Sequence, residues 1–172
     1  FSQYMVQFAS DRYVTFAVDT EKADGLKIPV TAVTEKEFYL IPQEYAATDE
    51  KGNVEYFMRE TQDESGAVVT EKLTIPIYSE SDTDYYVDTY SLRVGDNICK
   101  PDSADKYPIS KVGTLIGVYN INKGFADFKE ITILYSNDEY SIVKSNTNYG
   151  LLEYDYIVLD AESINEDDFI NE

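Results

Sequence analysis

Alternating apolar and polar positions dominate the chain from Gly117 to Asp160. Between Phe125 and Leu134, the apolar side chains are separated by Lys, Glu and Thr, which is the period-two pattern of a half-buried strand. Asn122-Lys123-Gly124 and Ser136-Asn137-Asp138 interrupt this pattern with residues typical of tight turns. We therefore predict strands at 118–121, 125–134, 140–143 and 156–159, joined by short loops.

The first half of the chain shows the same signals at wider spacing. Glu37–Ile41 is a short apolar strand pattern, and Val54–Arg59 and Ala67–Ile77 flank the turn sequence Asp63-Glu64-Ser65-Gly66 as a hairpin. No window has the pattern of a three-turn helix, so we predict an all-β chain with short antiparallel strands. Other expected elements are a hairpin at 1–18 around Asp11-Arg12, an extended segment at 26–30, a strand at 85–87 and a turn at 94–98 that enters a strand.

Several strand sequences of the first half recur in the second half. Tyr90–Ile98 aligns with Tyr149–Ile157, with Tyr, Leu, Asp and Ile at the same offsets. This repeat predicts two related β-units in series, each a small barrel-like or sandwich-like unit, at residues 1–105 (with an inserted hairpin) and 106–172. The other matches are Lys27–Val33 with Lys106–Val112, Ile75–Ser79 with Ile131–Ser136 after a one-residue slip, and Tyr85–Val87 with Tyr140–Val143.

Composition excludes several classes of function. The formal net charge of −19 repels phosphate backbones, so we expect no nucleic-acid partner. Without histidine, the chain has no Ser-His or Cys-His nucleophile pair and none of the usual His-containing zinc or iron sites. Cys99 is the single cysteine, so no intramolecular disulfide can form, and its thiol is expected to be a small buried group. No window approaches the ~18 apolar residues of a membrane span.

Three segments carry a resemblance to a known family. They are Gly25–Val33, with an IP-x-x-A-V pattern, Gly117–Ile131, with a GVY hairpin, and Gly150-Leu151 followed by Asp155–Val158. In this order they resemble the C-terminal region of HlyD-family membrane-fusion proteins (periplasmic adaptors) of the Gram-positive type. The resemblance implies a β-barrel domain followed by a membrane-proximal domain. Because the chain begins with Phe1 rather than Met, we expect it to be part of a longer protein.

The resemblance also implies a function. Such proteins are not enzymes and need no cofactor; they lie on the extracellular face of the cytoplasmic membrane, are anchored by an upstream segment, and dock on an ABC-type or similar exporter. The resemblance is also compatible with self-association. Tyrosine is favoured at protein interfaces, so we take Tyr85, Tyr86, Tyr154 and Tyr156 as candidate partner contacts.

Two other classes of function stay open at this point. A cell-surface β-domain could stack tyrosine rings on carbohydrate, or bind calcium through Asp82-Thr83-Asp84 or Glu166-Asp167-Asp168, although no calcium-loop spacing is present. A glycosidase would need two carboxyl groups at a set distance. Among the 33 acidic residues, the sequence singles out no such pair, so we name no catalytic residue.

Overall fold

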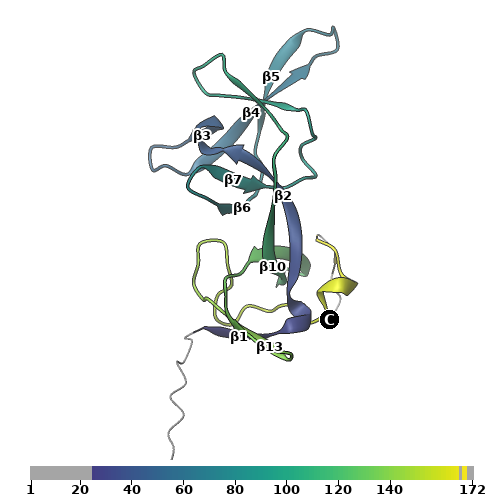
Figure 1. Cartoon of the computed structure of the whole chain (residues 1–172). Coiled ribbons are helices and arrows are strands. Elements are labelled where there is room, and N and C mark those ends of the chain that lie inside the picture. Colours follow the sequence, from purple (N-terminus) through teal and green to yellow (C-terminus); the bar gives the residue numbers. More distant parts are fainter. Residues whose placement is uncertain (1–24, 167, 170–172) are drawn as a thin grey trace, which may run out of the picture.

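The computed structural model describes residues 25–166 and 168–169, so the hairpin expected at 1–18 lies outside the described residues. This part of the chain consists of antiparallel strands and three short 3-10 helices, which confirms the all-β, barrel-like prediction (Figure 1). In chain order the elements are β1 (Leu26–Pro29), η1 (Val30–Ala32), β2 (Thr34–Pro42), η2 (Gln43–Tyr45), β3 (Ala46–Thr48), β4 (Val54–Gln62), β5 (Val68–Leu73), β6 (Ile77–Glu80), β7 (Asp84–Val87), β8 (Asn97–Cys99), β9 (Lys106–Pro108), β10 (Val112–Asn122), β11 (Phe125–Glu130), β12 (Ile133–Ser136), β13 (Tyr140–Val143) and η3 (Ala161–Ser163).

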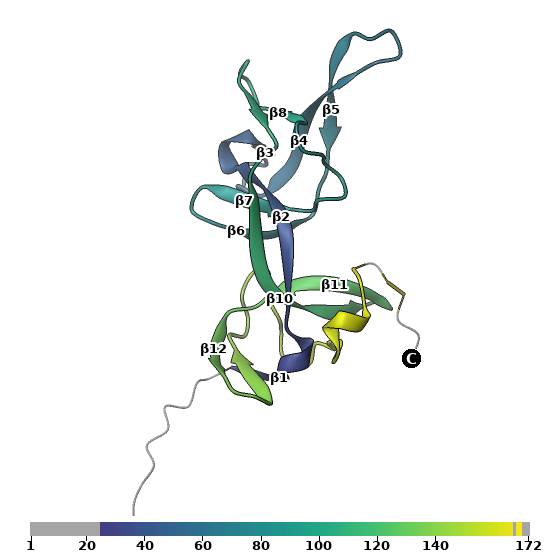
Figure 2. The same ribbon diagram turned by 45° about the vertical axis from the view of Figure 1, so that its right-hand side comes forward.

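Two lobes are joined by the long strands β2 and β10, which run side by side between them (Figures 1 and 2). Lobe A contains β3–β9, and lobe B contains β1, β11–β13 and residues 144–166 and 168–169. β2 pairs with β10 at the end nearer lobe B and with β7 in lobe A. From residue 25 on, the described chain thus passes from lobe B to lobe A along β2 and returns along β10. Residues 25–33, which precede the boundary expected near 105, pack in lobe B.

Each lobe has its own apolar core. The core of lobe A is one cluster drawn from residues 41–109, with Phe57 and Val87 fully buried. Lobe B has two clusters: one under β1 and β13, and one at the lobe junction, where Phe38 packs on Phe128 and Tyr78. Burial of this apolar area is the main favourable term in folding each lobe.

Two hairpins show that the internal repeat is structural. In β6–β7, Ile77 pairs with Val87 and the register shifts before Ser79 pairs with Tyr86. In β12–β13, Ile133 pairs with Val143 and the register shifts at the same point, before Tyr135 pairs with Ile142. The correspondence of these segments is confirmed, but the predicted one-residue slip is wrong. Ile75 and Ile131, two residues before each hairpin, are equally buried.

The strand before each repeat also matches. Tyr39–Pro42 pairs with β7 in the register that Leu26–Pro29 adopts with β13. Each strand ends at a proline that opens a 3-10 helix, which suits the fixed φ of proline and its lack of a backbone donor. The counterpart of β1 is therefore the end of β2, so the predicted match of Lys27–Val33 with Lys106–Val112 is wrong.

A turn after each hairpin completes the repeat and confirms the alignment of 90–98 with 149–157. The Asp96 carboxylate accepts a hydrogen bond from the Arg93 backbone N–H (3.0 Å), and the Asp155 carboxylate accepts one from the Leu152 N–H (2.8 Å). The preceding residue has a positive φ in both turns, 94° at Gly95 and 76° at Tyr154. The buried leucines that open these turns, Leu92 and Leu151, belong to the two lobe cores.

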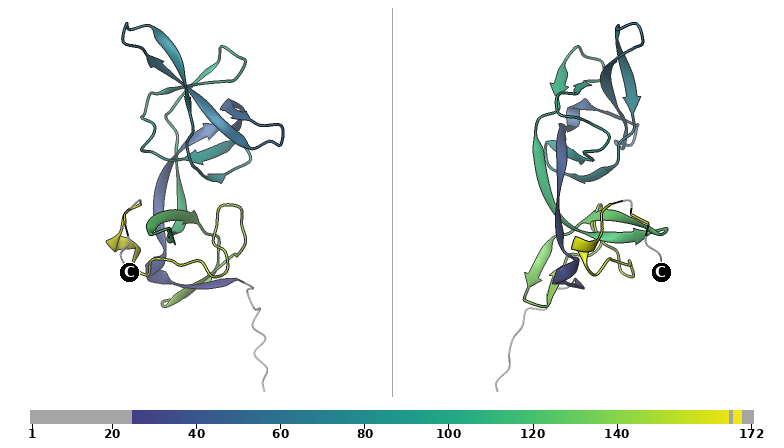
Figure 3. Two further views of the ribbon diagram at one scale, coloured as in Figure 1. Left: turned by 180° about the vertical axis from the view of Figure 1, so that it is seen from behind. Right: turned by 90° about the vertical axis from the view of Figure 1, so that its right-hand side faces the viewer.

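By the same registers, the β4–β5 hairpin is the counterpart of β10–β11, because each precedes the repeated hairpin and crosses the core. The Arg59–Glu71 pair in lobe A corresponds to the Asn120–Asp127 pair in lobe B. The loops differ: five residues follow Gln62 in lobe A, whereas Lys123-Gly124 alone, with φ of 52° and 87°, closes the turn in lobe B. In both views of Figure 3, the β4–β5 hairpin projects from the end of lobe A farthest from lobe B.

Candidate partner-binding surface

The segment Leu152–Leu159, which we call the tyrosine loop, presents large apolar side chains to solvent. Tyr154 is 86% exposed and Tyr156 is 78% exposed, and Leu152 and Leu159 are each more than half exposed. Their neighbours Leu151 and Val158 point into the core. An exposed tyrosine offers a large contact area with few rotatable bonds, so fixing it in a complex costs little entropy.

Hydrogen bonds hold the backbone of the tyrosine loop against lobe B. The carbonyl of Tyr156 accepts bonds from the Ile121 N–H (2.8 Å) and from the Asn120 side-chain amide (2.9 Å). The Val158 N–H donates to the carbonyl of Tyr119 (2.9 Å), and the Thr31 hydroxyl donates to the carbonyl of Leu159 (2.6 Å). The rings therefore project from a backbone that is fixed at several points, which is the preorganisation that favours binding.

The two other predicted contacts are placed differently. Tyr85 is 8% exposed and packs edge-on against Phe57 in the core of lobe A. Burial, with a smaller contribution from Glu80, raises the pKa of Tyr85. Tyr86 is half-buried and packs against the cluster between the lobes. Tyr154 and Tyr156 are thus both exposed on the same loop, whereas Tyr85 and Tyr86 are in packed positions, so we keep only the first two as contact candidates.

Sequence reasoning missed the two leucines of this surface. Tyr156–Leu159 was predicted to be a strand, and this is wrong: the described structure has a single bridge here, between Asn120 and Ile157. The composition suits a strand, but the loop pairs with β10 only around Asn120.

The described residues give less support to a metal site. They contain no group of three or more acidic or cysteine side chains that would hold a metal ion. The Asp84 carboxylate accepts a bond from the Thr83 hydroxyl, and Glu166 pairs with Lys36. Asp168 accepts a bond from the Asn165 N–H, while Asp167 lies outside the described residues. Cys99 is half-buried rather than buried.

Over the same residues, no helix is long and apolar enough to cross a membrane. Comparisons of the chain with protein-family models, with curated proteins and with solved structures found no match.

Proposed function

We propose that this chain is part of a non-enzymatic adaptor subunit of an export system, which docks on the extracellular part of an ABC-type or similar transporter. The adaptor lies on the extracellular face of the cytoplasmic membrane, and a segment outside this chain anchors it there. The tyrosine loop, with Leu152, Tyr154 and Tyr156 exposed on a fixed backbone, is the observation that carries this proposal.

The position of the motifs adds support. The GVY segment runs along β10 into the β10–β11 hairpin, and the Gly150-Leu151 segment leads directly into the tyrosine loop. Two of the three segments that carry the sequence resemblance therefore meet in lobe B, where the Val158 N–H donates to the carbonyl of Tyr119. An adaptor needs a binding surface of this kind, because its affinity comes from a few buried aromatic anchors surrounded by polar residues.

Photo-crosslinking in the full-length protein tests this proposal. p-Benzoylphenylalanine replaces Tyr154 in the organism that produces the protein, and the crosslinked product is identified by mass spectrometry. We expect a product that contains a transporter permease. The matched control carries the same group at Tyr90, which is 74% exposed in lobe A, and should not give that product.

The outcomes separate the candidate functions. Crosslinks from Tyr154 to soluble proteins only, or equal yields from Tyr154 and Tyr90, contradict the adaptor proposal. A product that contains cell-wall polysaccharide instead supports a carbohydrate-binding domain, for which exposed tyrosine rings are also suited.

A further inference from the structure

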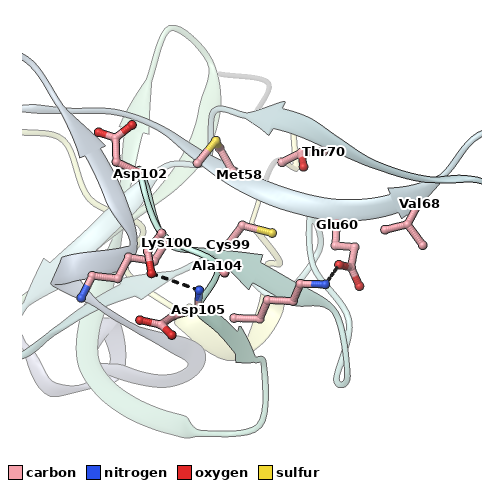
Figure 4. Close-up of a pocket in the computed structure, with 11 residues that line it drawn as sticks. Met58, Glu60, Val68, Thr70, Cys99, Lys100, Asp102, Ala104 and Asp105 are labelled. Atoms are coloured by element: carbon pink, nitrogen blue, oxygen red, sulfur yellow. Dashed lines mark hydrogen bonds and ion pairs between the residues drawn. The ribbon is translucent and has the colours of Figure 1, made fainter.

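A groove of about 560 Å3 opens in lobe A between the β4–β5 hairpin and the loop that joins β8 to β9 (Figure 4). Met58, Glu60 and Thr70 line one side from adjacent positions of β4 and β5, and residues 99–100 and 102–106 line the other. This volume lies in the range of pockets that hold small ligands.

One wall of the groove, and the outer end of the other, are additions to the unit that the lobes share. The β4–β5 hairpin is longer than its counterpart β10–β11, and Val68 lies in the added part. After β8, the chain makes a turn and returns as β9, whereas the described chain after Ile157 has no returning strand. Lobe B shares the repeated hairpin and turn but lacks these additions, so the groove is not part of the shared unit.

The lysines of the groove are already paired. Lys106 forms an ion pair with Glu60, and the Lys100 ammonium lies 2.6 Å from a carboxylate oxygen of Glu44. The bond to Glu44, and to a smaller extent the charge of Asp105, raise the pKa of Lys100. Among the described residues, no cation forms an ion pair with Asp102 or Asp105. The groove therefore carries surplus negative charge.

The rest of the groove is lined by a mixture of apolar and polar groups, among them Thr70 and Ser103. Met58, Val68 and Ala104 contribute hydrocarbon or thioether surface, and Val68 is 61% exposed. In Figure 4, Val68 lies towards one end and Asp102 towards the other. Met58 and Val68, in the same groove as the carboxylates of Asp102 and Asp105, suit a lysine or arginine side chain, which buries its methylene stem and keeps its charged head among hydrogen-bond acceptors.

We propose that this groove binds a lysine or arginine side chain of an extended, basic segment of a partner protein. The net charge of −19 attracts such a segment over a distance, and Asp102 and Asp105 select the cation at close range. The groove lies in lobe A, so this contact is separate from the tyrosine loop and does not depend on the adaptor proposal.

Titration of the isotope-labelled chain with a defined peptide, followed by NMR, tests the proposal. The probe is acetyl-Ala-Val-Lys-Val-Ala-amide, and the matched peptides carry glutamate or norleucine in place of lysine. We expect shift changes at Glu60, Thr70 and residues 99–106 with the lysine peptide. We expect none with the glutamate peptide and at least about tenfold weaker binding with norleucine.

Charge variants separate the groove from the general field of the molecule. The double variant D102N/D105N should bind the lysine peptide about tenfold more weakly, because both surplus carboxylates are removed. D82N/D138N makes the same charge change in two exposed hairpin loops and should bind as the unmodified chain does. An equal loss in both variants, shift changes outside the groove, or no response up to about 5 mM peptide overturns the proposal.

Discussion

At the scale of single residues, one glycine allows close packing on a strand that joins the two lobes. Gly117 lies where β10 passes from its pairing with β2 to its pairing with β11 alone. A Cβ atom there would lie 2.2 Å from the Phe128 ring and 2.4 Å from the carbonyl oxygen of Lys129. The backbone oxygen cannot move aside without disturbing the β10–β11 pairing, so this position needs a glycine for close approach rather than for a positive φ.

We expect Gly117→Ala to destabilise the protein by about 3 kcal/mol, because overpacking a filled core forces shifts of the backbone. The measurement is urea denaturation followed by circular dichroism. Gly113→Ala is the matched control on the same strand: its Cβ meets side-chain atoms of Tyr86 and Leu40, which have more freedom to move. Its cost should be clearly smaller, and equal costs for the two variants would contradict this account.

Turn residues were predicted well from the sequence because their conformations are local. Lys123-Gly124 closes a hairpin as the sequence indicated, and Asp155 caps a turn like that of Asp96. The burial of tyrosine was not predictable: Tyr85 and Tyr156 lie in similar β-rich sequence, but one is in a core and the other in solvent. That difference depends on long-range pairing, since Tyr85 lies on a central strand and Tyr156 beside the end of β10.

At the level of elements, the strands were predicted better than their limits. β10 begins at Val112 rather than at Val118, because its first half is paired with β2, a long-range contact that the local sequence does not show. The part of the groove formed by Asp102 and Ala104 could not be predicted from the sequence either, because the residues around it are typical only of a polar linker. Only a comparison of lobe A with lobe B shows that this loop is an addition, and that comparison requires the strand registers.

The added part of the β4–β5 hairpin gives a prediction at this level. Replacing residues 62–68 with Asn-Gly would join Thr61 to Val69, which form a cross-strand pair, by a two-residue turn like that of β10–β11. The removed residues are all exposed, so we expect cooperative unfolding with a Tm within about 5 °C of the original. Thermal unfolding followed by circular dichroism measures this.

The shortened variant also loses Val68 from the groove, and the lysine peptide should bind it several-fold more weakly while Glu60 and Asp102 are kept. A large fall in Tm would mean that the hairpin tip supports the core of lobe A. It would then be wrong to treat the tip as an addition to the shared unit.

At the level of the whole molecule, the lobes differ in how far each depends on the other. The buried core of lobe A is drawn entirely from a continuous stretch, Ile41–Ile109. Lobe B is discontinuous, and its cluster around Phe38 and Phe128 is covered in part by Tyr78 and Tyr86 from lobe A. Lobe A is therefore a self-contained unit inserted into lobe B, and contacts with lobe A complete the core of lobe B.

This asymmetry predicts the behaviour of the separated lobes. Residues 39–111 should fold alone and unfold cooperatively in urea, with a stability of about 2–4 kcal/mol, which is typical of a core of about 70 residues. Lobe B, made by joining Tyr39 to its cross-strand partner Val112 through Asn-Gly, should be less stable than the isolated lobe A, because Tyr78 and Tyr86 no longer cover Phe38. Adding lobe A in trans should not restore it, since the continuous β2–β10 ribbon is cut. If lobe B instead folds as stably as lobe A, the contacts between the lobes contribute little, and the two units are independent domains joined only by that ribbon.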